Sequence, residues 1–144
     1  MGLLRIARTP LVTINPQAAV LEAVKTMDRE RIGAVAVTEG TILVGIFSER
    51  DLMLRVVLEN RDVERTRIRE VMTSPVETIR RDSTADDALK LMLEKHIRHL
   101  PLVDRDGKLA GMISIRNLLQ DKVEDLTDQL DSLEAYFTAD GSGG

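Results

Sequence analysis

Apolar residues along the chain form short runs typical of strands, separated by longer stretches in which they recur at helical spacing. Breaker residues such as Pro10 and Asn15-Pro16 bound the first run, and a Glu39-Gly40 turn separates two later ones. The pattern predicts a unit of strand, helix, strand, strand and helix. Its elements are expected over residues 11–14, 18–31, 34–37, 42–47 and 48–59.

The same order of elements is written twice. Val76-Glu77-Thr78-Ile79 corresponds to Leu11-Val12-Thr13-Ile14, and the later elements follow at the same offset with about one inserted residue. Each half leaves a face that it cannot bury alone, so we expect the halves to pack together with pseudo-two-fold symmetry. The predicted fold class is α/β (α+β). The expected divisions are a first repeat at 1–60, a connector at 61–75, a second repeat at 76–122, and an acidic C-terminal helix at 123–144 with a flexible end from Asp140.

The junction between the last strand and last helix of each repeat carries one motif. It reads Gly45-Ile46-Phe47-Ser48-Glu49-Arg50-Asp51 in the first repeat and Gly111-Met112-Ile113-Ser114-Ile115-Arg116-Asn117 in the second. A Ser followed three residues later by Asp or Asn is a helix capping box. The same geometry offers free N–H groups, a hydroxyl and a carboxylate to a phosphate or a ribose, and the Gly allows close approach to the backbone. The sequence alone leaves both interpretations open.

Composition narrows the function classes. A net charge of −4 argues against a nucleic-acid partner held by phosphate neutralisation. Aromatic residues make up 2% of the chain, so a flat ligand would have to lie against aliphatic side chains and backbone. No Cys is present, which excludes disulfide and thiolate chemistry. The absence of a signal-peptide run and of a long apolar window predicts a cytoplasmic protein without a membrane partner.

Residues typical of catalysis or metal binding are few. His96 and His99 are the two histidines, and no third ligand is placed near them by sequence, so no metal site is expected. Ser48 has no His base assigned to it. The chain is therefore predicted to be a binding protein and not an enzyme, with no catalytic residue.

The end of the chain carries a heptad pattern. Apolar residues spaced 4, 3, 4, 3 and 4 apart, with acidic residues between them, predict one continuous helix: Leu119, Val123, Leu126, Leu130, Leu133 and Phe137. This stripe has two interpretations: it packs back on its own domain, or it pairs with a second protomer. The second, a homodimer through the Leu119–Phe137 helix, is the one that the acidic surface favours.

Together these features resemble a tandem pair of CBS domains, also called a Bateman module. The resemblance covers about residues 6–122 and includes Glu70-Val71-Met72-Thr73 and residues 97–104. The chain resembles the small stand-alone CBS-pair proteins. The resemblance implies that an adenine nucleotide (AMP, ADP or ATP) binds between the repeats and that occupancy is transmitted to an unidentified regulated protein by a conformational change. The alternative is a dimeric scaffold whose motifs are only helix caps.

The resemblance also implies two sites, each combining a junction of one repeat with strands of the other. The main site would contain Ile46, Phe47, Ser48, Glu49, Arg50, Asp51, Glu77, Thr78, Ile79, Arg98, His99 and Pro101. There Arg98 would face phosphate, unless it is a solvated strand-edge arginine. The second site would contain Thr13, Ile14, Gly33, Ala34, Ser114, Arg116 and Asn117. Asn117 replaces the Asp of the family motif and Gly33 replaces the basic residue, so this site is expected to bind weakly, to bind an uncharged molecule or to stay empty.

Overall fold

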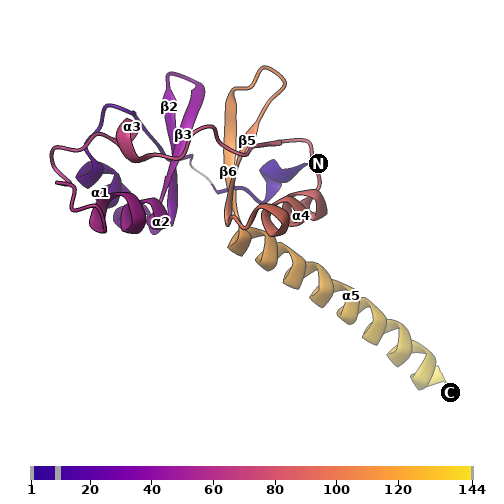
Figure 1. Cartoon of the computed structure of the whole chain (residues 1–144). Coiled ribbons are helices and arrows are strands. Elements are labelled where there is room, and N and C mark those ends of the chain that lie inside the picture. The colour runs from indigo at the N-terminus through magenta and orange to yellow at the C-terminus, as the bar shows by residue number, and fades with distance from the viewer. Residues whose placement is uncertain (1, 9–10, 144) are drawn as a thin grey trace.

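The computed structural model describes the backbone of residues 2–8 and 11–143 and the side chains of residues 2–8 and 11–137. It contains two three-stranded sheets of the same topology (Figure 1). In each, the first strand pairs in parallel with the second, and the second pairs antiparallel with the third. The strands are β1 (Thr13–Ile14), β2 (Ala34–Glu39) and β3 (Ile42–Ser48), then β4 (Ile79–Arg80), β5 (His99–Val103) and β6 (Leu109–Ser114).

Helices follow the first and third strand of each sheet. The first repeat has α1 (Val20–Glu30), then α2 (Glu49–Asp51), which continues as a π-helical segment η2 (Leu52–Val57). The second repeat has α4 (Ala85–Lys95) and α5 (Ile115–Gly143). Two short helices complete the fold, η1 (Leu3–Arg5) at the start and α3 (Ile68–Val71) in the connector. The predicted α/β fold of two strand-helix-strand-strand-helix repeats with a C-terminal helix is confirmed.

Each repeat contributes a segment to the core of the other. We call residues 3–8 and 68–73 the crossing segments. Leu3 is buried in the second core with Ala88, Leu100 and Ile113. Ile68 and Val71 are buried in the first core. Burying one such side chain contributes about 1.5–3 kcal/mol, so neither core is complete without the crossing segment that packs into it.

The crossing segments also extend the two sheets at the motif glycines. Ile46 and Thr73 exchange backbone hydrogen bonds of 3.0 and 2.8 Å, and Arg8 N–H donates to the Met112 carbonyl at 3.0 Å. A Cβ at Gly45 would collide with the side chain of Met72, whereas a Cβ at Gly111 would meet the Cβ of Ala7 at 3.4 Å, an ordinary contact. The close approach that Gly45 allows is therefore that of a crossing segment.

Helix α5 projects from the body into solvent (Figure 1). Its first turns are anchored: Leu118 is buried, Asp121 pairs with Arg5 at 2.7 Å, and Lys122 pairs with Asp86 at 3.1 Å. Beyond Lys122 its described side chains are exposed. The flexible end expected from residue 140 starts inside this helix, and residue 144 lies outside the described residues.

The two motif glycines give a matched test of this packing. Gly45→Ala should lower the free energy of unfolding by about 1 kcal/mol, because the flexible, half-buried side chain of Met72 must shift to make room for the methyl. Gly111→Ala should change it by less than about 0.5 kcal/mol, because space for the methyl exists. Urea denaturation with unchanged m-values measures both. Equal losses in the two variants would contradict the assigned packing.

Candidate functional site

Both junctions of the repeated motif are capping boxes. In the first, Ser48 N–H donates to Asp51 Oδ2 at 3.0 Å, and Asp51 N–H donates to Ser48 Oγ at 3.2 Å. In the second, Ser114 N–H donates to Asn117 Oδ1 at 3.0 Å, and Asn117 N–H donates to Ser114 Oγ at 3.1 Å. The capping interpretation is therefore confirmed in both copies, and any ligand would bind at a junction that also caps a helix.

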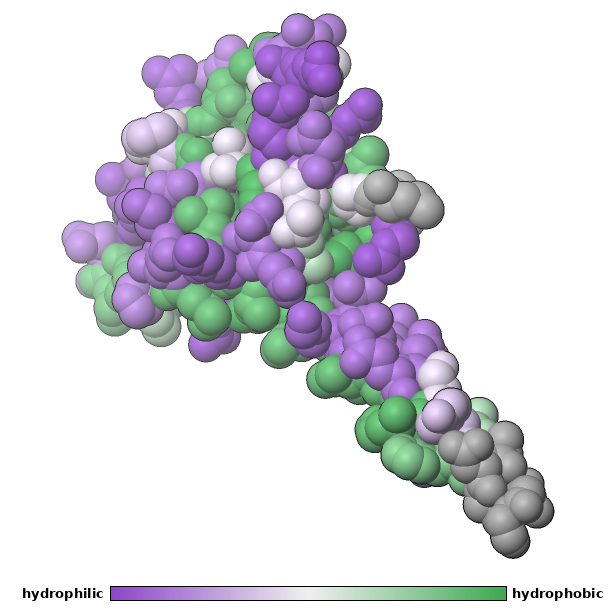
Figure 2. Space-filling model, turned by 90° about the vertical axis from the view of Figure 1, so that its right-hand side faces the viewer, coloured by the Kyte–Doolittle hydropathy of each residue, from purple (hydrophilic) through white to green (hydrophobic). Residues whose placement is uncertain are grey.

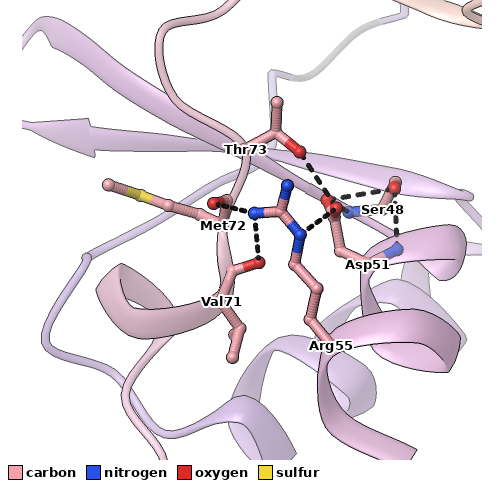
Figure 3. Close-up of polar contacts among 6 residues, drawn as sticks. All are labelled: Ser48, Asp51, Arg55, Val71, Met72 and Thr73. Atoms are coloured by element: carbon pink, nitrogen blue, oxygen red, sulfur yellow. Dashed lines mark hydrogen bonds and ion pairs between the residues drawn. The ribbon is translucent and has the colours of Figure 1, made fainter. Parts of the chain in front are cut away.

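The carboxylate of Asp51 is held by the connector as well as by its own cap. Thr73 Oγ1 donates to Asp51 Oδ1 at 2.9 Å, and Arg55 Nε lies 3.7 Å from the same oxygen (Figure 3). Arg55 Nη1 also donates to the Met72 carbonyl at 2.8 Å. Asp51 is only 7% exposed, and both of its carboxylate oxygens accept hydrogen bonds from protein groups.

A cavity of about 900 Å³ opens between the two repeats beside the second junction. This volume lies within the range of about 300–1,000 Å³ typical of small-molecule sites. Its polar end contains Ser114, Arg116 and Asn117 at the start of α5. Apolar residues from both repeats form much of the remaining wall: Leu11, Val12, Val24, Met27, Ile32, Ala34, Leu52, Met112 and Ile115.

The cavity wall is positively charged. Four arginines and two carboxylates line it, a net charge of +2 with neutral histidine: Arg8, Arg31, Arg98, Arg116, Asp28 and Glu49. Arg8 reaches Glu30 through Nη2 at 3.1 Å, but its buried Nε–H has no hydrogen-bond partner among the described residues. A buried donor without a partner costs about 1–3 kcal/mol, and an acceptor on a bound molecule would remove that cost.

His99 stands in the same wall, at the start of β5. The pKa of His99 is lowered from its ordinary value of 6.5 because burial disfavours the charged imidazolium. The Glu49 carboxylate opposes this shift and the Arg98 guanidinium adds to it. Gly33 makes room for the ring, since a Cβ there would lie 3.3 Å from Cε1 of His99.

The structure groups the expected site residues differently from the two sets that the resemblance implied. Glu49, Arg98 and His99, expected in the main site, line the cavity together with five residues of the second set: Gly33, Ala34, Ser114, Arg116 and Asn117. Thr13 and Ile14 pair with β2 instead, and Ile14 is buried in the first core.

The other expected residues of the main site lie around Asp51 and along the strands. Phe47 is fully buried in the first core and Pro101 is buried in β5. Ile46 lies in β3 and Ile79 in β4. Ser48 caps α2, and Arg50 is exposed on that helix. Glu77 and Thr78 precede β4, and the Glu77 carboxylate pairs with Lys95 at 3.8 Å. These placements leave Asp51 as a junction already filled by its own chain.

Sequence reasoning missed several residues that the structure brings to the junctions: Arg8, Leu11, Val12, Arg31, Arg55 and Thr73. Thr73 and Arg8 occupy matching places in the two crossing segments, each beside the last strand of a repeat. The duplicated sequence shows this correspondence only when it is known that each crossing segment packs against the other repeat. Arg31 ends α1 in the left-handed conformation, which the sequence does not signal.

Among the described residues, no group of three His, Cys, Asp or Glu side chains is arranged to hold a metal ion. Within the same part of the chain, none of the helices has the length and apolar character needed to cross a membrane.

The lowered pKa of His99 predicts a pH dependence of stability. Below pH 6.5 the unfolded chain binds the proton more readily than the folded chain, so stability rises with pH there. The contribution is fully present above pH 6.5 and is lost as the pH falls. His99→Gln should therefore lose less stability than wild type between about pH 7.5 and 5.5, measured by urea denaturation. His96→Gln, at an exposed position, is the control and should keep the wild-type slope; identical slopes in all three would contradict the assignment.

Comparison with known proteins gives a consistent result. A family model for the CBS domain matches the chain twice, over residues 4–58 and 68–124. Protein MK0525 of Methanopyrus kandleri is 36% identical over 116 residues, which cover 80% of this chain and 59% of that protein. This chain therefore spans less than two thirds of the length of that relative.

Solved structures share the fold. A CBS-domain protein from Burkholderia ambifaria superimposes with a TM-score of 0.80 at 34% identity, covering 87% of this chain and 96% of that one. Two others are complexes with AMP. PAE2072 from Pyrobaculum aerophilum has a TM-score of 0.73 at 25% identity, covering 81% of this chain and 89% of that one. CBSX2 has a TM-score of 0.69 at 26% identity, covering 82% of this chain and 91% of that one. The duplicated fold and these matches show that this chain belongs to the CBS-domain family, as a tandem pair of CBS domains.

Proposed function

We propose that this chain is a regulatory module that binds an adenine nucleotide (AMP, ADP or ATP) between its repeats. Occupancy would be transmitted to an unidentified partner in the cytoplasm as a conformational change, without catalysis. The observation that carries the proposal is the positively charged cavity between the repeats, which opens at a helix start. The AMP complexes of two relatives support the choice of ligand.

We assign each part of a nucleotide to a different set of the residues that line the cavity. Adenine would lie against Leu11, Val12 and Ile32, because this chain provides almost no aromatic ring for stacking. The ribose would face Ser114 and Asn117. The phosphates would face the arginines, whose charge-assisted hydrogen bonds each contribute about 1.5–3 kcal/mol.

The two junctions would differ in the order in which they fill. At Asn117, Oδ1 is engaged by the cap, and the side-chain NH₂ is the group left for a ligand. At Asp51, a ribose would have to displace the hydroxyl of Thr73. We therefore propose that the cavity beside Asn117 fills first and that the Asp51 site fills only when Thr73 is released.

A second candidate function is a dimeric scaffold whose junctions are only helix caps. The two observed capping boxes favour it, because capping alone is a sufficient reason for the Ser and the Asp or Asn. Nucleotide titration separates this candidate from the first. Homodimerisation is compatible with both functions, and we propose it for the nucleotide-binding module as well.

Exchanging the two motif side chains tests where the nucleotide binds. Asn117→Asp should raise affinity for AMP about tenfold, because a carboxylate accepts ribose hydroxyls more strongly than an amide can. Asp51→Asn should leave the first binding event unchanged. Both substitutions keep a side chain that can complete the capping box, so both variants should fold. Isothermal titration calorimetry with AMP and ATP measures the dissociation constants.

The possible failures of that experiment are distinguishable. Weaker binding by Asp51→Asn, with no gain in Asn117→Asp, would place the first nucleotide at Asp51 and contradict the proposed order alone. No heat from either nucleotide with wild-type protein, up to about 1 mM ligand, would contradict nucleotide binding and favour the scaffold.

The arginine lining gives a prediction about phosphate number. Arg98→Ala should weaken ATP binding by about ten- to a hundredfold and AMP binding by less, because additional phosphates extend toward more of the basic wall. Arg105→Ala, an exposed arginine in the turn between β5 and β6, is the matched control and should leave both affinities unchanged. Equal effects of the two substitutions would contradict a role for Arg98 in phosphate binding.

A further inference from the structure

The apolar stripe of α5 is uncovered along its whole described length. Its members are between 50% and 62% exposed: Leu119, Val123, Leu126, Leu130, Leu133 and Phe137. Figure 2 shows apolar surface running from the lower side of the body along this helix. The contacts that anchor α5 end at Lys122, so the alternative in which the stripe packs on its own domain is not what the structure contains.

The residues that flank the stripe indicate what covers it. In the heptad, the stripe occupies the a and d positions, and the flanking e and g positions are mostly uncharged: Gln120, Lys122, Thr127, Gln129, Glu134 and Tyr136. The remaining acids occupy b, c and f, away from the seam: Asp121, Glu124, Asp125, Asp128 and Asp131. An acidic helix with near-neutral edges can approach a copy of itself without strong repulsion.

We propose that α5 forms a two-stranded coiled coil with α5 of a second copy of this chain. The strict seven-residue repeat keeps the seam on one side only when the helix winds around a partner of the same period. A second α5 has that period and the same edge residues. A basic partner would instead be expected to meet acids at e and g, and here Glu134 is the one acid at those positions. The d positions are Leu119, Leu126 and Leu133, typical of two-stranded coiled coils.

This inference does not rest on the proposed ligand. The seam begins at Leu119 and is made from α5 alone, whereas the nucleotide would bind within the body. Oligomeric state and nucleotide affinity are separate measurements, so failure of one leaves the other standing.

A matched pair of substitutions tests the seam. Leu130→Asp places a carboxylate in the middle of the stripe, and Ala135→Asp places the same carboxylate at an outward f position nearby. Leu130→Asp should raise the dimer dissociation constant at least about a hundredfold, because an unpaired charge would be buried between two apolar helices. Ala135→Asp should leave it within about threefold of wild type. Sedimentation velocity of the full chain over a concentration series measures both constants.

Neither substitution touches a core, so both variants should keep the wild-type melting temperature of the body. A wild-type chain that remains monomeric up to about 100 µM would overturn the proposal. A dimer that Leu130→Asp leaves intact would also overturn it and would place the interface elsewhere, for example at the exposed apolar residues of η2, Met53, Leu54 and Val57. A dimer lost only in Leu130→Asp supports it.

Discussion

The exchange of the crossing segments is the constraint on which the rest of this molecule depends. Each half consists of a sheet and two helices. The remaining side of its core is covered by the crossing segment of the other half. Leu3 and Ile68 occupy equivalent places in the two cores. Because each half contributes a segment to the core of the other, the two halves are held together, and the cavity lies between them.

The same constraint makes the two junctions chemically unequal. Each crossing segment ends beside the last strand of a repeat, one with Thr73 and the other with Arg8. Thr73 is short and donates to the Asp51 carboxylate, so that junction is satisfied from within. Arg8 is long, and its buried Nε–H, at the wall of the cavity, has no hydrogen-bond partner within the part of the chain that the structure describes. A duplicated motif has thus acquired one closed and one open environment through a residue outside the motif.

Local pattern was sufficient for the parts of the fold that local forces determine. Short apolar runs bounded by turn residues located the strands, and the spacing of Ser48 with Asp51 located a helix start, because both depend on neighbours within a few residues. The composition of the cavity could not be obtained in this way. Arg98 and His99 were assigned to Asp51, yet they line the space beside Asn117. That grouping is set by how the two halves pack, and a single sequence does not encode such distances locally.

The motif glycines show that a correct physical rule does not by itself identify the approaching group. Glycine was expected to allow close approach to the backbone, and it does. At Gly45, however, the approaching group is the side chain of Met72, which arrives from the connector. A sequence reader could have found this only by aligning Ala7 with Met72 as equivalent members of the crossing segments. To assign a function to a glycine, one must therefore know which group approaches it, and not only that glycine allows close approach.

Helix α5 joins the cavity to the exposed seam without a break in the backbone. Its first residues, including Arg116, Asn117 and Gln120, line the cavity, and its apolar stripe starts at Leu119. An α-helix transmits rotation and translation along its axis, because each turn is hydrogen-bonded to the next. A ligand that binds differently to two positions of the helix start must bias the position of the seam by the same free energy. Linkage is reciprocal, so if both proposals hold, pairing of two seams would bias the cavity by the same free energy.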